Sequence, residues 1–207
     1  MKYFRRFFII TVTIFIVFLL YLEFGGMFIL KTNDKRTITF NIRSSEKIPN
    51  NFSNFYNTVY PNSLSENSWN YMSGIFTNSD SPRKECPCNQ MSYKILPTLE
   101  IKHTKRINYF MNQFIVARFI ENKFSQKECL QFNFGSFDFL ENRKGLSEVS
   151  HSLFKKDAKD LKPMEMAEIL ALYEAPLKYN RSRNPQKAKE RTEHFYHVYL
   201  NNSKIKN

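Results

Sequence analysis

The chain opens with a long apolar run that basic residues precede. An uncharged stretch covers residues 7–22, and after Glu23 a second uncharged stretch continues to Leu30. Crossing the hydrocarbon core of a bilayer takes about 20 apolar residues. A cleaved signal sequence has a shorter apolar core of about 7–15 residues and a small-x-small cleavage site. The pattern therefore favours an uncleaved transmembrane helix within residues 1–30, and a cleaved signal is the alternative.

Residues 31–104 follow without a sustained helical period. The alternation of apolar and polar residues in Thr37–Arg43, TITFNIR, is typical of a short strand. From there to about Lys94 the chain is dense in Asn, Ser and Pro. We therefore expect loops and short elements in this segment.

From residue 105 onward, apolar residues recur at helical spacing. Ser125 and Glu128 have the spacing of a capping box, in which each side chain accepts from the backbone N–H of the other residue. Pro163 suits the first turn of a helix, where the N–H that proline lacks has no helical partner. Helices are predicted in 105–124, after Ser125, in 145–154, in 163–175 and from Pro185 onward.

Two prolines punctuate the joint between the last two predicted helices. Pro176 ends the first helix, because proline disfavours helical conformation in the residue before it. Asn184 can cap the second helix and Pro185 can open it. The stretch APLKYNRSRNP is therefore predicted to be a helix–elbow–helix joint in a mainly α body.

The 207-residue chain carries a formal net charge of +12. Such a charge favours polyanions, namely nucleic acid, anionic lipid headgroups or pyrophosphate-bearing substrates. Beside a membrane anchor, lipid or lipid-linked phosphate is the more natural partner, and we expect no nucleic-acid partner. Basic residues flank the apolar run on both sides and hardly discriminate its orientation. The short N-terminal tail favours a single-pass topology with a cytoplasmic N-terminus and an external body.

The cysteines and histidines do not point to a metal ion or a cofactor. Cys86 and Cys88 have no second cysteine pair, so neither a zinc site nor a disulfide framework is expected, and Cys129 is interpreted as a buried residue. His194 and His197 are three residues apart, within reach of one metal ion, but are interpreted as surface or half-buried aromatic residues. We expect no metal ion and no cofactor.

An ordered set of motifs covers residues 150–191, SHSLFKKDAKDLKPMEMAEILALYEAPLKYNRSRNPQKAKER. An Asp-Leu pair precedes an Ala- and Glu-rich helix, and Ala-Pro-x-x-Tyr-Asn and Asn-Pro-x-x-Ala-x-x-Arg follow. This segment resembles the C-terminal part of family 51 glycosyltransferases, the peptidoglycan transglycosylases. The matching residues are Ser150, Phe154, Lys156, Asp160, Leu161, Glu165, Ala167, Ala175, Pro176, Tyr179, Asn180, Arg183, Asn184, Pro185, Ala188 and Arg191.

The resemblance implies a lysozyme-like transglycosylase lobe with an N-terminal transmembrane helix. Members of the family join lipid-linked disaccharide units into a glycan. One Glu, in Glu-Asp-x-x-Phe-x-x-His-x-Gly, is the general base, and a second Glu, in Arg-Lys-x-x-Glu, helps the diphosphate leave with nearby basic residues. The expected domains are an anchor at 1–30, an irregular region at 31–104 that would be a reduced jaw, and a helical transglycosylase-like domain at 105–207.

Neither family Glu is found in its motif. No Glu-Asp pair is followed by the required Phe and His, and the glycine-rich donor motif, Gly-Gly-Ser-Thr-x-x-Gln-Gln, has no match near CPCNQMSY. Ungapped alignment back from Glu121 and Ser125 places Gln113 at the second Glu. Matching the basic pair to Lys105-Arg106 places Tyr109 there instead. The two positions are one helical turn apart and share a face.

We therefore predict a membrane-anchored, non-catalytic transglycosylase-like protein of cell wall biogenesis. Gln113, Glu121, Lys156 and Arg183 are its candidate substrate-binding residues. The expected partners are a lipid-linked peptidoglycan precursor or a glycan strand, the membrane, and other cell-wall synthesis proteins. The alternative is a divergent, active glycosyltransferase that uses Glu100, Glu121 or another carboxylate.

Overall fold

The computed structural model of the protein describes residues 2–76, 85–101 and 106–205. Within these ranges the secondary structure is helical, apart from an isolated antiparallel bridge between Asp138 and Lys144. The mainly α fold expected from the sequence is confirmed. The elements are α1 (Lys2–Phe24), α2 (Gly26–Ile29), α3 (Thr32–Arg43), α4 (Asn50–Val59), α5 (Ser68–Phe76), α6 (Pro87–Ile95), η1 (Leu96–Thr98), α7 (Arg106–Glu121), α8 (Gln126–Gly135), α9 (Leu146–Phe154), η2 (Ala158–Asp160), α10 (Pro163–Glu174) and α11 (Pro185–Ile205).

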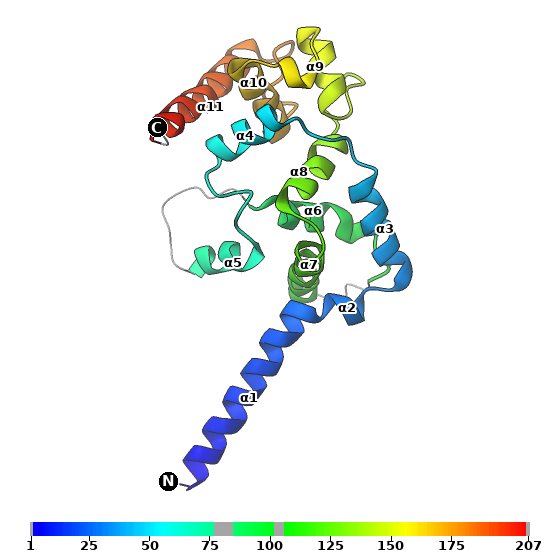
Figure 1. Cartoon of the computed structure of the whole chain (residues 1–207), viewed down its shortest axis with the longest axis vertical. Coiled ribbons are helices and arrows are strands. Elements are labelled where there is room, and N and C mark those ends of the chain that lie inside the picture. The colour runs from blue at the N-terminus through cyan, green and yellow to red at the C-terminus, as the bar shows by residue number, and fades with distance from the viewer. Residues whose placement is uncertain (1, 77–84, 102–105, 206–207) are drawn as a thin grey trace.

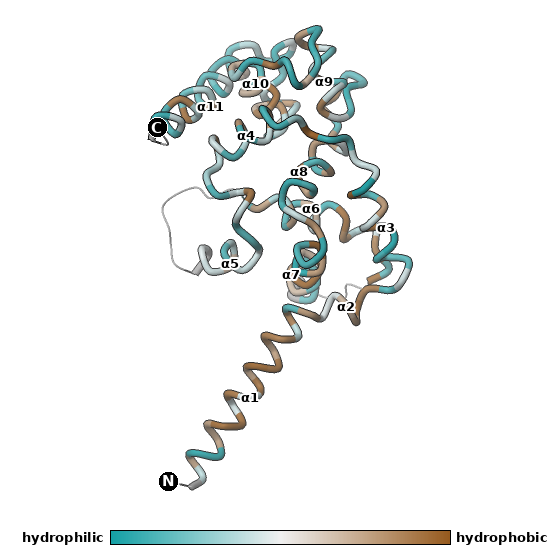
Figure 2. Tube along the Cα trace, viewed as in Figure 1, coloured by the Kyte–Doolittle hydropathy of each residue, from teal (hydrophilic) through white to brown (hydrophobic). Residues whose placement is uncertain are grey.

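Helix α1 extends from the body as an apolar rod (Figures 1 and 2). Its 22 residues from Tyr3 to Phe24 have a hydropathy of 2.5, and they are almost entirely unburied. At about 1.5 Å per residue they reach about 33 Å, and the hydrocarbon core of a bilayer is about 30 Å thick. In the described part of the chain, α1 is the one helix that is long and apolar enough to cross a membrane.

The apolar run seen in the sequence does not continue as one helix to Leu30, because α2 turns the chain against α7. A Cβ atom at Gly26 would lie 2.6 Å from the Phe119 Cβ, so a glycine is needed for this close approach. At the end of α1, Leu22 packs with Phe114 and Ile115 of α7. The rod is therefore seated directly on α7.

The strand predicted at Thr37–Arg43 is wrong, because these residues form the last two turns of α3. Asp34, Ile38 and Ile42 are the buried residues of this helix, and their spacing of four places them on one helical face. The Asp34 carboxylate accepts a hydrogen bond from the Lys31 N–H at 3.2 Å, which satisfies a donor at the start of the helix. Burial at every fourth residue outweighs the β propensity of the Thr and Ile residues.

Residues 31–104 are more regular than the sequence suggested, since they contain α3 to α6. Their apolar side chains share two hydrophobic cores with the later helices. In one core, Phe52 of α4 packs among residues of α8 to α11, and its ring centroid lies 5.0 Å from that of Phe134. In the other core, Met91 of α6 packs with residues of α3, α7 and α8. The domain boundary at 104/105 stays a prediction, and the two sides of it pack together.

The helices predicted from residue 106 onward are confirmed, and the signals that predicted them are local. Ser125 caps α8, since its Oγ accepts from the Glu128 N–H at 3.3 Å and the Glu128 carboxylate accepts from the Ser125 N–H at 2.8 Å. Pro163 opens α10, which ends two residues before Pro176, and Pro185 opens α11. Helices α10 and α11 pack along each other at the end of the body opposite α1 (Figure 1).

A disulfide joins Cys88 of α6 to Cys129 of α8, across a sequence separation of 41 residues. The prediction that the cysteines form no disulfide framework is therefore wrong, and Cys129 is buried as a disulfide partner. Sequence spacing gave no signal, because the packing of α6 against α8 brings the two cysteines together. Cys86, the remaining cysteine, is a buried free thiol.

Candidate functional site

Gln113 lies at a pocket of about 220 Å³ that α5, α6 and α7 enclose. The pocket is more apolar than polar, with a few polar groups among aromatic side chains, which is the usual character of a ligand site. Its lining residues are Tyr71, Met72, Glu85, Asn89, Tyr93, Phe110, Gln113 and Phe114. Gln113 therefore lies at a pocket rather than in the core, and its correspondence to the second family Glu stays a prediction.

The pocket contains a carboxylate that sequence reasoning did not single out. Glu85 precedes α6 and lines the same wall as Tyr71. Burial, together with the negative charge and the hydrogen bond of Glu85, raises the pKa of Tyr71 to about 12. The phenol is therefore protonated at neutral pH and donates to the carboxylate. Gln113 adds an amide that can both donate and accept, so the pocket offers groups suited to hydroxyl-rich ligands.

Two aromatic side chains line the pocket while remaining open to solvent. Tyr93 is 58% exposed and Phe110 is 49% exposed. Tyr93 also packs edge-to-face against Tyr109, with ring centroids 6.3 Å apart. Tyr109, the other candidate for the second Glu position, therefore lies beside the pocket and contacts one of its lining residues. The two registers considered for α7 lead to the same neighbourhood of the fold.

Glu121 occupies a buried polar network two turns further along α7. Its carboxylate accepts from the backbone N–H of Ser68 at 2.9 Å, the side-chain amide of Gln126 at 3.0 Å and the thiol of Cys86 at 3.3 Å. It also pairs with Arg118, and the Glu121 side chain is 5% exposed. These contacts assign Glu121 a structural role, and its binding of substrate stays a prediction.

The same network reaches α1, the apolar N-terminal helix. Arg118 donates from Nη2 to Glu23 Oε1 at 2.7 Å and from Nε to Glu23 Oε2 at 2.9 Å. The indole N–H of Trp69 donates to Glu23 Oε2 at 2.7 Å. Glu23 is the charge that interrupts the apolar run, and such a residue usually has a specific partner. The network therefore fixes the end of α1 to α7, the helix that carries Gln113.

Lys156 lies far from this network, in the turn after α9. Its ammonium group pairs with the Glu165 carboxylate of α10, and its backbone carbonyl accepts from the buried Ser150 hydroxyl at 2.6 Å. Although burial opposes the shift, the hydrogen bond from Lys156 lowers the pKa of Glu165. This intramolecular pair would compete with the phosphate contact expected of Lys156, which stays a prediction.

Side-chain amides of two asparagines hold the elbow between α10 and α11 through hydrogen bonds. Asn180 is 1% exposed, donates to Glu141 Oε1 at 2.9 Å and accepts from the Ser182 N–H at 2.8 Å. Asn184, predicted to cap α11, donates its side-chain N–H to the Leu177 carbonyl at 3.2 Å. The Asn residues of both family motifs therefore hold the elbow in its conformation.

The two arginines of the family motifs, Arg183 and Arg191, differ in their contacts at this joint. Arg191 of α11 binds Glu174 of α10 through two hydrogen bonds, at 2.6 and 2.7 Å, and lies over the Phe195 ring with 4.4 Å to the centroid. Arg183 is exposed. Its role in binding substrate stays a prediction, and it is the better placed of the two to meet a ligand.

The candidate residues therefore fall into two groups. Gln113 and Glu121 lie on α7 near the base of α1, and Lys156 and Arg183 lie near α9 to α11 at the other end of the body (Figure 1). Sequence reasoning missed the Glu85 carboxylate, because α5 and α6 were not expected to wall a pocket. It also missed the pairing of Glu23 with Arg118, for which the interrupted apolar run was the available signal.

The described residues contain no group of three or more His, Cys, Asp or Glu side chains that could hold a metal ion. His194 and His197 are exposed on α11, as their interpretation as surface residues implied.

The fold defines a helical, lysozyme-like lobe seated on an apolar N-terminal helix. The family model described as Transglycosylase matches residues 89–199, more than half of the chain. The chain therefore belongs to the transglycosylase family, and the resemblance seen in its C-terminal motifs is confirmed. The match begins at Asn89, so it includes most of α6 and the part of the Gln113 pocket lined by α6 and α7.

A comparison with curated proteins finds "Penicillin-binding protein 1A" of Neisseria lactamica, which is 23% identical over 137 residues. The alignment covers 66% of this chain and 17% of that protein. The chain thus corresponds to a small part of that relative, and similarity of sequence extends beyond the family match.

Proposed function

We propose that this protein is a membrane-anchored, transglycosylase-like component of cell wall biogenesis that binds lipid-linked peptidoglycan precursor or glycan without polymerising it. The Gln113 pocket would hold the ligand. Family membership and the similarity to a penicillin-binding protein support a role with peptidoglycan. The apolar helix α1 supports anchoring in the membrane where such precursors are carried.

The observation that carries the proposal is the position of Gln113. It lines a pocket of the transglycosylase fold, and the ungapped alignment proposed from the sequence matches it to a catalytic Glu of the family. A glutamine can hydrogen-bond a ligand but cannot accept a proton as a base or carry charge against a leaving diphosphate. A site of this kind favours retention of the ligand over its turnover.

The alternative, an active and divergent glycosyltransferase, is favoured by one specific observation. Glu85 lines the same pocket as Gln113 and supplies a carboxylate there. A carboxylate that reaches an acceptor hydroxyl can act as a general base, which is typically worth about 10²–10⁴-fold in rate. Of the two carboxylates named from the sequence, Glu100 pairs with Lys31 and Glu121 is enclosed in its network. Glu85 is therefore the carboxylate on which this alternative rests.

We further propose that the body faces the periplasm or the cell exterior. Disulfides persist in oxidising compartments and are rare in the cytosol. The Cys88–Cys129 bond joins two helices of the body, so an oxidising surrounding fits it best. This agrees with the orientation that the short N-terminal tail favours.

The test uses the full chain in nanodiscs with purified lipid II as the probe. We expect saturable binding of fluorescent lipid II and no glycan polymer on a gel after overnight incubation. Polymer above the level of empty nanodiscs would contradict the non-catalytic proposal. If polymer forms and is lost in Glu85→Gln, the protein is an enzyme that uses Glu85.

Glu66→Gln provides the matched control, because it removes a carboxylate outside the pocket lining. We expect Glu85→Gln to weaken lipid II binding and Glu66→Gln to leave it unchanged. If neither the wild-type chain nor any variant binds lipid II or isolated glycan, the proposed ligand class is wrong.

A further inference from the structure

Helix α3 carries an outer face that no element of the described chain covers. Its buried residues, Asp34, Ile38 and Ile42, point into the body. On the opposite side, Phe40 is 70% exposed, although a phenylalanine in a soluble surface is usually more covered. The helix is therefore amphipathic in an unusual sense, with an apolar stripe inward and an aromatic side chain outward among basic residues.

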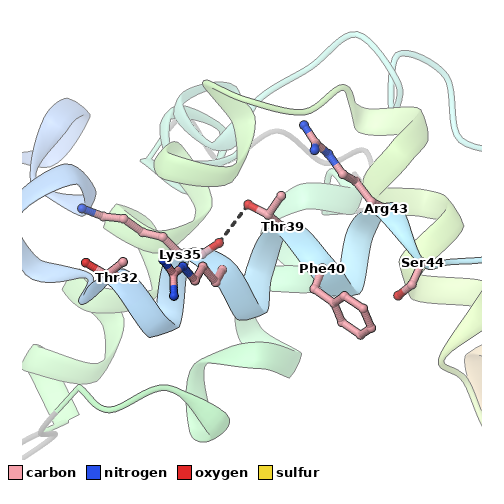
Figure 3. A pocket seen from close by; sticks show the side chains of 7 residues that line it. Thr32, Lys35, Thr39, Phe40, Arg43 and Ser44 are labelled. Atoms are coloured by element: carbon pink, nitrogen blue, oxygen red, sulfur yellow. Dashed lines mark hydrogen bonds between the residues drawn. The ribbon is translucent and has the colours of Figure 1, made fainter.

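The outer face forms an open hollow of about 610 Å³. Its lining residues, here called the α3 basic face, are Thr32, Lys35, Arg36, Thr39, Phe40, Arg43 and Ser44. Figure 3 shows these side chains projecting from one helix, with the Phe40 ring directed outward and the hydroxyl of Thr39 bonded back to the Lys35 carbonyl. Three cationic side chains and no acidic one line the hollow, so it favours an anionic partner with an apolar portion.

The charges of this face are not neutralised by the surrounding elements. Lys35 donates to the backbone carbonyl of Met27 at 2.7 Å, which leaves its charge in place. Arg36 and Arg43 are exposed, and neither has an ionic partner among the described residues. The nearby ion pair of Lys31 with Glu100 is separate and closed on itself at 2.6 Å.

The α3 basic face follows the membrane-spanning helix directly in the chain. Between α1 and α3 lies α2, whose Met27 is 50% exposed and whose Phe28 is 86% exposed. Figure 1 shows α2 at the base of the body, beside the end of α1, with α3 rising from it. Aromatic side chains at the edge of a span are typical of the membrane–water interface, and basic clusters beside a span attract anionic headgroups.

We propose that the α3 basic face docks on the headgroups of anionic phospholipids in the bilayer that α1 crosses. The basic side chains would pair with lipid phosphates, and Phe40 and Phe28 would enter the interfacial region. This docking would tilt the body so that the α3 side of the molecule meets the membrane. The inference rests on the membrane anchoring proposed above and is independent of the ligand of the Gln113 pocket.

The test compares the full chain in nanodiscs of phosphatidylcholine alone with nanodiscs that contain phosphatidylglycerol as well. Hydrogen exchange of the α3 amides, residues 32–43, is the readout. Each basic side chain near an anionic surface contributes about a fivefold gain in binding, so we expect exchange at least several-fold slower with phosphatidylglycerol. Salt at about 1 M shortens the screening length to about 3 Å and should abolish the difference.

Neutralisation of the face supplies the second arm. We expect the triple variant Lys35→Gln, Arg36→Gln and Arg43→Gln to exchange equally in both nanodiscs. The matched control, Lys178→Gln, Lys187→Gln and Lys189→Gln, removes the same charge around the elbow and the start of α11 and should keep the difference. Exchange of the α11 amides reports whether either variant still folds, and the single variants Arg36→Gln and Arg43→Gln should each lose part of the effect.

Two results would overturn the proposal. One is the absence of an effect of the basic face, seen either as equal exchange of α3 in the two nanodiscs for the wild-type chain or as a triple variant whose exchange slows with phosphatidylglycerol as much as that of the wild-type chain. The other is slower exchange that requires an added acidic protein, which would assign the face to a protein partner. Lipid II binding is measured separately, so failure here leaves the proposed function of the Gln113 pocket standing.

Discussion

The C-terminal joint and the α6 and α7 walls of the Gln113 pocket belong to one transglycosylase match, but they preserve the family pattern differently. In the joint, family residues such as Asn180 and Arg191 are held in hydrogen bonds inside the fold. In the pocket, Gln113, which we propose stands at a family catalytic position, lines open space. The proposed alignment of Gln113 with the second family Glu implies that this chain keeps the residues that hold helices together and changes one that would act on a substrate.

The contrast between the two regions requires that the internal hydrogen bonds and ion pairs stabilise the fold. It would be contradicted most strongly if the fold were equally stable without them. Arg118 lies between Glu23 and Glu121 in the network that seats α1 on α7. Arg118→Met should lower the free energy of unfolding by about 3–5 kcal/mol, because it leaves buried carboxylates without their partner. Thermal unfolding of the full chain in detergent, followed with a thiol-reactive dye that detects the exposure of Cys86, measures this loss.

Arg36→Met is the matched control for that substitution, since Arg36 lies on the exposed face of α3. It should change the free energy of unfolding by no more than about 0.5 kcal/mol. Equal losses of unfolding free energy in the two variants would show that the network does not stabilise the fold, which would contradict the structural role assigned to it.

Removal of the Cys88–Cys129 disulfide should cost somewhat less. Closing a loop of this length contributes about 2–4 kcal/mol, chiefly through the unfolded chain. Cys88→Ala with Cys129→Ala should therefore lower the free energy of unfolding by that amount in a denaturant titration. The disulfide can also be tested by labelling. Alkylation of the unreduced, denatured chain should label Cys86 alone.

Cys86 serves as its own test of the folded state. Burial and the carboxylate of Glu121 raise the pKa of its thiol to about 12, so the reactive thiolate is scarce at neutral pH. The thiol should react slowly in the folded chain and quickly after unfolding. Labelling of all three cysteines without reductant would contradict both the disulfide and the proposed outward orientation of the body.

A smaller effect is expected at the elbow. Arg191→Ala removes a two-bond ion pair with Glu174 and the contact with Phe195, both partly exposed. It should lower the free energy of unfolding by about 1–2 kcal/mol while the affinity for lipid II changes little. If thermal stability stays unchanged and ligand binding disappears, the elbow serves binding first and its structural interpretation is wrong.

The sequence predicted the helices that local signals define, and it failed to predict those that depend on distant contacts. The caps and prolines around α8, α10 and α11 act within a few residues, so Ser125, Pro163 and Pro185 marked these helices correctly. Residues 31–104 acquire their helices through distant partners, and their local composition resembled loops and a strand. Burial of Ile38 against the second core is an example of a contact that no local pattern announces.

The candidate site was predictable in part for the same reason. The family pattern singled out Gln113 by alignment back along α7 from Glu121 and Ser125, and its assignment to the second family Glu stays a prediction. No sequence signal predicted that Glu85 lines the pocket, because only the packing of α5, α6 and α7 brings it there. The pairing of Cys88 with Cys129 likewise depends on two helices that are remote in the sequence.

The central claim is that a retained scaffold carries an altered site, and Gln113→Glu tests it most directly in a lipid II polymerisation assay. The substitution restores the carboxylate nearest to where a diphosphate would leave, but a base for the acceptor hydroxyl would still be missing. Because such a base is typically worth about 10²–10⁴-fold in rate, the account predicts no detectable glycan polymer from this variant. Polymer formation by Gln113→Glu alone would contradict it, since another residue such as Glu85 would then serve as the base.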